Sequence, residues 1–272
     1  MTERAIERPG AERMGFFTDT TVCIGCKACE VACKQWNDLP AEETEFKPGS
    51  SYDFTNELGA TTWRHVRFVE LLADEEPASP SWVFMSDVCK HCAHAGCLDA
   101  CPTGALIRTE FDTVVLQPDV CNGCGYCIPA CPFGVVDRDK IDGRAAKCTL
   151  CYDRLQDGLE PACAKSCPTD SIQFGPYDEI VDLAQRRVTE LHARGTERAY
   201  LYGADDDLAG GLGAFFLLTE PPERYGLPAN AESPIQENVV PATLAAMGAG
   251  LLAAAGVAAA FVAGARGRRT RW

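Results

Sequence analysis

The sequence predicts an α+β fold that ends in one long apolar helix. Three observations lead to this prediction. The 16 cysteines of the 272-residue chain fall into four short runs, strand-like segments follow three of these runs, and no charged residue occurs between Glu237 and Arg266. We therefore expect one mixed domain over residues 1–235. Residues 236–272 should form the end of a linker, a transmembrane helix at about 240–264 and a basic tail.

The cysteine runs have the spacing of metal sites. Run one, Cys23–Cys33, reads C-x2-C-x2-C-x3-C, and runs two, three and four span Cys89–Cys101, Cys121–Cys131 and Cys148–Cys167. Disulfide frameworks spread their cysteines between strands, whereas these are confined to compact groups. Paired C-x2-C motifs alone would favour zinc ribbons. The x3 spacing before each last cysteine and the three Cys-Pro endings favour four 4Fe-4S clusters instead.

Short strands are predicted where a run ends in Cys-Pro, because proline fixes the backbone at a corner between loop and strand. The strand segments are 104–110 and 113–117 after Cys101, 134–139 and 143–147 after Cys131, and 171–175 after Cys167. Run one differs, since Lys34 follows Cys33 and good helix formers surround it, which predicts a helix that continues past Cys33. This ferredoxin pattern predicts two ferredoxin-like dicluster units with insertions.

Hydrophobic periodicity predicts the remaining elements. They are an inserted loop at 37–62, strands at 62–71 and 81–85, a helix at 177–195, strands at 199–203 and 214–222, and a linker at 224–241. The helix has one apolar face, formed by Ile180, Leu183, Ala184, Val188 and Leu191. We expect Asp178 to cap this helix and Gly195 to end it.

Each cluster should take three ligands from one run and a fourth from another, because the last cysteine of a run is carried away by the chain. Runs two and three are adjacent and joined by a hairpin, so they should form one unit, and runs one and four the other. The predicted ligand sets are Cys23, Cys26, Cys29 with Cys167; Cys148, Cys151, Cys163 with Cys33; Cys89, Cys92, Cys97 with Cys131; and Cys121, Cys124, Cys127 with Cys101. His91 and His94 are interpreted as nearby donors or surface residues and not as ligands.

The remaining features favour an electron carrier without catalytic residues. A net charge of -14 argues against a nucleic-acid partner, which needs Lys and Arg to neutralise phosphate. The sequence has no P-loop, and the ligand sets use every cysteine. A structural or sensing iron-sulfur protein is the alternative from another class. One cluster suffices to sense, whereas four in series suit conduction.

The motifs resemble those of the four-cluster iron-sulfur subunits of molybdenum or tungsten pterin oxidoreductases, especially the beta subunit of formate dehydrogenase. The segments that carry the resemblance are 15–37, 89–106, 121–135 and 147–169. The resemblance implies the same crossed pairing of runs, a formate-oxidising pterin subunit as donor, and a membrane cytochrome b or other quinone-reacting subunit as acceptor. Relatives serve nitrate, sulfoxide, polysulfide and hydrogen enzymes, so a relay for one of those remains the alternative.

The uncharged C-terminal stretch resembles the single transmembrane helix of the formate type. As a helix, residues 239–265 would span about 40 Å, although their Ala and Gly content leaves a peripheral or partner-buried helix as the alternative. The stretch has no histidine to ligate haem. The positive-inside rule puts the arginine-rich tail in the cytoplasm and the cluster domain outside the cell membrane. Residues 1–17 lack a signal peptide, so export requires a signal-bearing partner; without one the relay stays on the cytoplasmic side.

Overall fold

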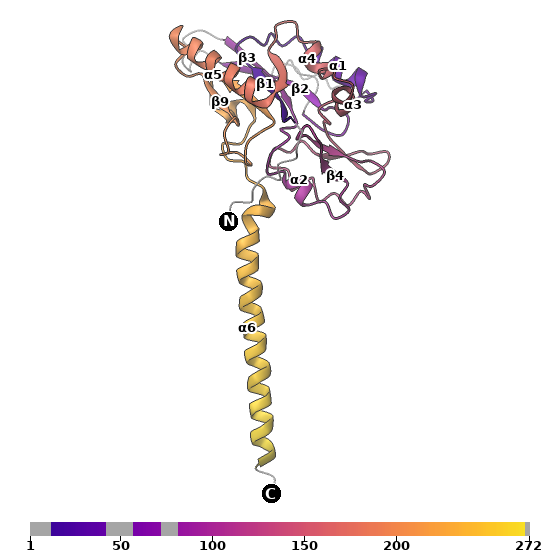
Figure 1. Cartoon of the computed structure of the whole chain (residues 1–272), viewed down its shortest axis with the longest axis vertical. Coiled ribbons are helices and arrows are strands. Elements are labelled where there is room, and N and C mark those ends of the chain that lie inside the picture. The colour runs from indigo at the N-terminus through magenta and orange to yellow at the C-terminus, as the bar shows by residue number, and fades with distance from the viewer. Residues whose placement is uncertain (1–11, 42–56, 72–80, 270–272) are drawn as a thin grey trace. The chain divides into compact units, whose positions relative to one another are not determined.

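The computed structural model describes residues 12–41, 57–71 and 81–269 (Figure 1). The chain divides into two compact units, residues 1–233 and residues 234–272. Within the described residues, the first unit mixes short strands with helices, as an α+β fold requires, and the second is one helix. Part of the predicted loop at 37–62 and the final arginine, Arg271, lie outside the described residues.

A four-stranded sheet organises the first unit, with strand order β8-β1-β10-β9. Its strands are β1 (Met14–Asp19), β8 (Ile172–Pro176), β9 (Tyr200–Tyr202) and β10 (Ala214–Leu218). Strand β1 is antiparallel to β8 and parallel to β10, so Phe16 lies opposite Phe174 on one side and Ala214 on the other. The sequence pattern predicts β8, β9 and β10 but not β1. The whole of Gly15–Thr20 is buried, so β1 lacks the polar-apolar alternation of a half-exposed strand.

The alternation of side chains along β1 directs its two phenylalanines into different cores. Phe16 packs in the core that contains many of the cysteines. Phe17 packs in a second core and stacks on Phe215 with their ring centroids 5.5 Å apart. Helix α5 (Tyr177–Ala193) contributes to this second core, which contains no cysteine among its fully buried members. The sheet therefore separates the cysteine-bearing core from an ordinary apolar one.

Helix α5 confirms the predicted helix but not its predicted cap. Ile180, Ala184 and Leu191 are buried, as the apolar stripe predicts, and Gly195 follows the helix with a positive φ of 91°. The prediction that Asp178 caps this helix is wrong. Strand β8 ends at Pro176 and α5 begins at the next residue, so Asp178 already lies in the first turn. There its negative charge interacts favourably with the positive N-terminal end of the helix dipole.

The remaining elements of the first unit position the cysteine runs. They are α1 (Ala28–Trp36), β2 (Arg64–Leu71), β3 (Ser81–Val88), α2 (Gly96–Asp99), β4 (Leu106–Arg108), β5 (Val114–Leu116), β6 (Asp137–Arg138), β7 (Ala145–Ala146), α3 (Tyr152–Gln156), α4 (Ala162–Lys165) and the 3-10 helix η1 (Pro222–Tyr225). Three antiparallel pairs, β2-β3, β4-β5 and β6-β7, confirm the predicted strands. Helix α1 continues past Cys33, also as predicted, and packs against α4.

The second unit is the helix α6 (Pro234–Arg269). It begins within the segment predicted as a linker, so that prediction is wrong for residues 234–241. Pro234 stands at the first helical position, where its missing N–H costs nothing, and Glu237 lies in the first turn. The part Pro234–Gly264 has a mean hydropathy of 2.0 in its most apolar window and is long and apolar enough to cross a membrane.

Candidate metal centres

The cysteines of run one are arranged by a tight loop followed by helix α1. Gly25 and Lys27 both have left-handed backbone conformations, with φ of 66° and 61°. A side chain at Gly25 would place its Cβ 3.0 Å from the ring of Phe84. Only glycine adopts this conformation in the space available without strain. Cys29 and Cys33 then follow one turn apart on α1, and both are buried.

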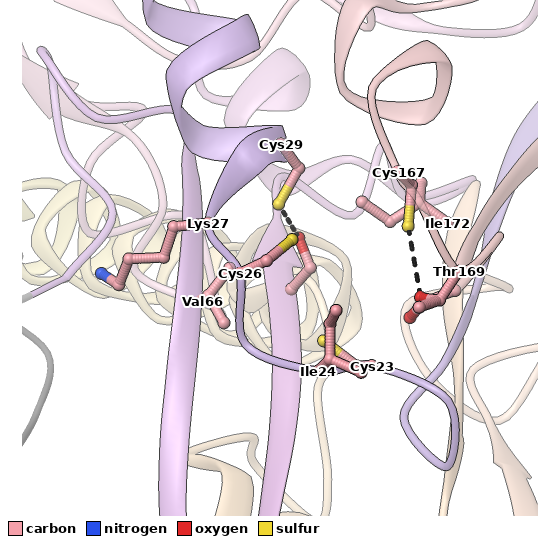
Figure 2. Close-up of a pocket in the computed structure, with 11 residues that line it drawn as sticks. Cys23, Ile24, Cys26, Lys27, Cys29, Val66, Cys167, Thr169 and Ile172 are labelled. Carbon is pink, nitrogen blue, oxygen red and sulfur yellow. Dashed lines mark hydrogen bonds between the residues drawn. The ribbon is translucent and has the colours of Figure 1, made fainter.

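Three cysteines of run one line a pocket together with Cys167 of run four. The pocket contains about 290 Å³ of empty space, part of it open to solvent. Figure 2 shows Cys167 approaching from a different segment than Cys23, Cys26 and Cys29. The pairing of β1 with β8 joins these segments, and beside it the Ser171 hydroxyl donates to the Asp19 carbonyl at 2.7 Å. Long-range strand pairing thus assembles this group.

A second pocket contains three cysteines of run two and one of run three. Cys89, Cys92, Cys97 and Cys131 line it, and its empty space is about 330 Å³, again partly open to solvent. Phe133, Val135 and Val136 contribute apolar walls. The β4-β5 hairpin between runs two and three returns the chain to this pocket.

Among the other eight cysteines, Cys33 lies near cysteines of run four, and Cys127 lies near the last cysteine of run two. Burial raises the pKa of Cys33, and the next contributions come from the thiolates of Cys148, Cys163 and Cys151. Burial likewise raises the pKa of Cys127, whose neighbouring thiolates are Cys101, Cys121 and Cys124. The two pockets each contain three cysteines of one run and the last cysteine of another, and the sequence predicts two further groups of the same kind, which makes four groups.

The donor chemistry of these groups fits iron-sulfur clusters. A cubane requires four sulfur donors around an object larger than a single ion, and the two pockets carry four cysteines each around their walls. Within the described residues, no group of three or more His, Cys, Asp or Glu side chains has the spacing for a single metal ion. The bound group would supply reversible one-electron chemistry at each site.

The protein surroundings favour neutral thiols unless a cationic group is bound. Burial raises the pKa of Cys29, Cys97 and Cys148 to about 12, and of Cys151 to about 11. Iron supplies the positive charge that keeps coordinating thiols deprotonated. Burial also limits the access of water to the bound group, which is one of the factors that set its reduction potential.

His91 offers a buried hydrogen-bond donor to the second pocket. Its Nδ1 accepts from the backbone N–H of Val114 at 3.1 Å, so the neutral ring carries its proton on Nε2. Burial, with the nearby charges of Lys147 and Arg108, holds the pKa of His91 well below its usual value. Nε2 is buried and has no hydrogen-bond partner in the described residues. Because His91 lines the pocket, a cluster sulfur is the acceptor we expect for this N–H. His94 is exposed.

Two buried basic residues that were not predicted as part of a site contact the cysteines. Lys147 donates to the carbonyls of Val114 and Cys148, and its Nζ lies 3.7 Å from Cys89 Sγ. Arg64 donates to Cys163 Sγ at 3.1 Å. Two signals were present in the sequence. Lys147 directly precedes a ligand cysteine, and Arg64 shares the period-2 phase of the buried Val66 along β2.

Comparison with known proteins agrees with this chemistry. Two models described as 4Fe-4S dicluster domains match residues 22–105 and 80–177. The formate dehydrogenase-O iron-sulfur subunit of Escherichia coli is 43% identical over 225 residues, which cover 81% of this chain and 73% of that protein. The iron-sulfur subunit of the nitrate-inducible formate dehydrogenase of the same species is 44% identical over 77% of this chain and 70% of its own length. A subunit of the anaerobic dimethyl sulfoxide reductase of that species is 37% identical over 61% of this chain and 75% of its own length.

The extent of these matches decides the family. The formate dehydrogenase relatives align over more than two thirds of both sequences, and the aligned length is sufficient to include the four cysteine runs. The matched domain models and the sulfur-lined pockets indicate the same cofactor type. The chain belongs to the family of formate dehydrogenase iron-sulfur subunits, electron-transfer proteins that carry 4Fe-4S clusters.

Proposed function

We propose that this chain relays electrons through four 4Fe-4S clusters, from a formate-oxidising molybdenum or tungsten pterin subunit to a membrane subunit that reduces quinone. The observation that carries the proposal is that two pockets each gather three cysteines of one run and the last cysteine of another, and we extend this arrangement to all 16 cysteines. The chain makes and breaks no substrate bonds itself. Its residues hold the clusters, shield them from water and set their electrostatic surroundings.

The proposed ligand sets follow the four groups. Set A is Cys23, Cys26, Cys29 and Cys167; set B is Cys148, Cys151, Cys163 and Cys33; set C is Cys89, Cys92, Cys97 and Cys131; set D is Cys121, Cys124, Cys127 and Cys101. Sets A and B connect runs one and four, and sets C and D connect runs two and three. This is the crossed arrangement of a dicluster ferredoxin unit, repeated twice.

Neighbouring thiolates support a linear order of the sets. Besides burial, a thiolate of the neighbouring set raises the pKa of one cysteine at each junction. Cys163 of set B acts on Cys29 of set A, and Cys89 of set C acts on Cys148 of set B. Cys127 of set D acts in the same way on Cys97 of set C. These neighbours, together with Lys147 between Cys89 and Cys148, support the order A-B-C-D. Cys26 in set A and Cys124 in set D are the exposed cysteines of the chain. Electrons would enter and leave at these two ends, where partner subunits can approach.

The relatives favour formate as the source of the electrons. Two of them are iron-sulfur subunits of formate dehydrogenases. The relative from dimethyl sulfoxide reductase favours a second candidate function, in which the same relay serves another pterin oxidoreductase. The four sets are equally suited to either role, so the catalytic partner decides between the two functions.

We place α6 across the cell membrane as a single anchor. The helix is long and apolar enough to span, and arginines follow its apolar part while acidic residues precede it. The positive-inside rule then puts the tail in the cytoplasm and the cluster domain outside. Clusters are built in the cytoplasm, so this placement requires export of the folded protein, which we propose occurs together with the catalytic partner. If that partner is not exported, the cluster domain faces the cytoplasm.

The cluster count predicts the metal content of the chain. Four cubanes contain about 16 iron and about 16 sulfide per chain. Elemental analysis of the anaerobically purified full chain measures both. Stoichiometric zinc with little acid-labile sulfide would contradict the cluster assignment.

The crossed ligand sets predict which cluster each mutation damages. Cys33→Ala should damage the cluster of set B and leave set A largely intact. Cys167→Ala is the matched variant and should have the reverse effect, because it removes the remote ligand of set A. EPR spectra of the reduced proteins and density for each cluster distinguish the two. Damage to set A in Cys33→Ala would show that the runs do not cross.

The proposed topology predicts the result of protease treatment. In intact spheroplasts, an outward-facing cluster domain should be digested while the tail after α6 is protected. Lysed spheroplasts provide the control, because there the protease reaches both sides. A cluster domain that survives in intact spheroplasts but not in lysed ones would exclude the outward placement.

The relay function predicts a separation of two activities. Membranes should couple formate oxidation to quinone reduction, and deleting this chain should abolish the coupling. The purified catalytic partner should still reduce an artificial dye with formate, since that reaction bypasses the relay. If the partner purified with this chain instead oxidises hydrogen or reduces nitrate, the formate assignment fails while the relay function stands.

A further inference from the structure

Arg64 lies between two of the proposed cluster sites. It is the first residue of β2 and only 1% exposed. Its Nη2 donates to Cys163 Sγ of set B at 3.1 Å, and its Nη1 donates to the Ser86 carbonyl at 3.2 Å. The hydroxyl of the same Ser86 is 3.2 Å from Cys29 Sγ of set A. Arg64 thus contacts a cysteine of set B directly, and Ser86 connects it to a cysteine of set A.

The charge of Arg64 is compensated by thiolates and not by carboxylates. In the described part of the chain, no Asp or Glu forms an ion pair with it, and its Cζ lies 4.8 Å from the centroid of the Phe16 ring. A buried charge is tolerated only where an opposite charge compensates it. The ligand cysteines provide that charge.

Unlike the other two guanidinium nitrogens of Arg64, the third nitrogen has no acceptor among the residues that the structure describes. Nε of Arg64 is buried and has no hydrogen-bond partner in the described residues. An unpaired buried donor is costly, and native proteins rarely contain one. A bound group with sulfur acceptors at sets A and B would remove this cost. The environment of Arg64 is therefore that of a counter-ion to an anionic group.

We propose that Arg64 is a fixed positive charge shared by sets A and B, and that it raises the reduction potentials of the clusters they hold. The inference rests on the proposed function, in which these sets ligate clusters. A cluster held by four thiolates is anionic and gains a further negative charge on reduction. A buried positive charge therefore stabilises the reduced form more than the oxidised form.

The shared position has a consequence for electron transfer between the two sites. Sets A and B are neighbours in the proposed order, and one guanidinium group contacts the surroundings of both. Its charge shifts both potentials in the same direction. Arg64 thus changes the difference in potential between the first two clusters of the line by less than a charge beside only one of them would.

The test is a potentiometric titration of the full chain followed by EPR, with two substitutions at one position. Arg64→Gln keeps a hydrogen-bond donor but removes the charge, whereas Arg64→Lys keeps the charge. We expect Arg64→Gln to shift the oxidised-to-reduced equilibrium of set B about tenfold toward the oxidised form, which lowers its potential by about 59 mV for one electron. Set A should shift in the same direction by less, and Arg64→Lys should restore most of both shifts.

Two controls separate this effect from a general disturbance. Sets C and D should shift less than sets A and B in Arg64→Gln, because Arg64 contacts neither. Arg198→Gln removes an exposed arginine that pairs with Glu220 at 3.2 Å, and it should leave all four potentials unchanged. Iron content is measured for every variant, so that loss of a cluster is not mistaken for a shift.

The outcomes separate failure of this inference from failure of the proposed function. Unchanged potentials in an Arg64→Gln chain with full iron would overturn the role of Arg64 while leaving the relay intact. Equal loss of iron in both Arg64 variants would assign it a packing role and also overturn the inference. Loss of iron in Arg64→Gln alone would support it, because only that variant lacks the positive charge. An unmodified chain without iron would instead contradict the proposed function.

Discussion

The pairing of β1 with β8 is the interaction on which the arrangement of the cysteines depends. It joins the start of the first unit to the segment after run four, with Phe16 opposite Phe174. This pairing brings Cys167 to the pocket of run one, and the packing of α1 on α4 places Cys33 beside run four. Loss of the pairing would separate both remote cysteines from their groups. Two of the candidate sites therefore depend on one long-range contact, whereas sets C and D depend on local hairpins.

Electrostatics imposes the second constraint, because the fold buries many thiols in a core of low polarity. Burial alone raises their pKa and opposes the thiolate form. Bound iron and buried cations work in the other direction. Arg64 contacts Cys163, and Lys147 reaches toward Cys89 from the residue before Cys148. These two side chains lie at successive junctions of the proposed order, so positive charge would be distributed along the proposed line of sites.

Local structure was largely predictable, and the errors have identifiable causes. The hairpins β4-β5 and β6-β7 follow Cys-Pro corners, and α1 continues past Cys33 where the proline is absent. Strand β1 was missed because burial on both faces removes the alternation that marks a strand. The linker was extended too far because Pro234, which suggests a break, instead begins α6.

By itself, the sequence determined the cysteine spacing, and with it the cofactor class, the proposed number of sites and the proposal that the last cysteine of each run binds with the cysteines of another run. It also determined the apolar length of α6, because composition alone sets that property. Only the tertiary structure decided which buried groups surround each site. His91, Lys147 and Arg64 carry no local motif, and their partners lie on distant strands. Their roles depend on burial and on neighbouring charge, which exist only once the chain has folded.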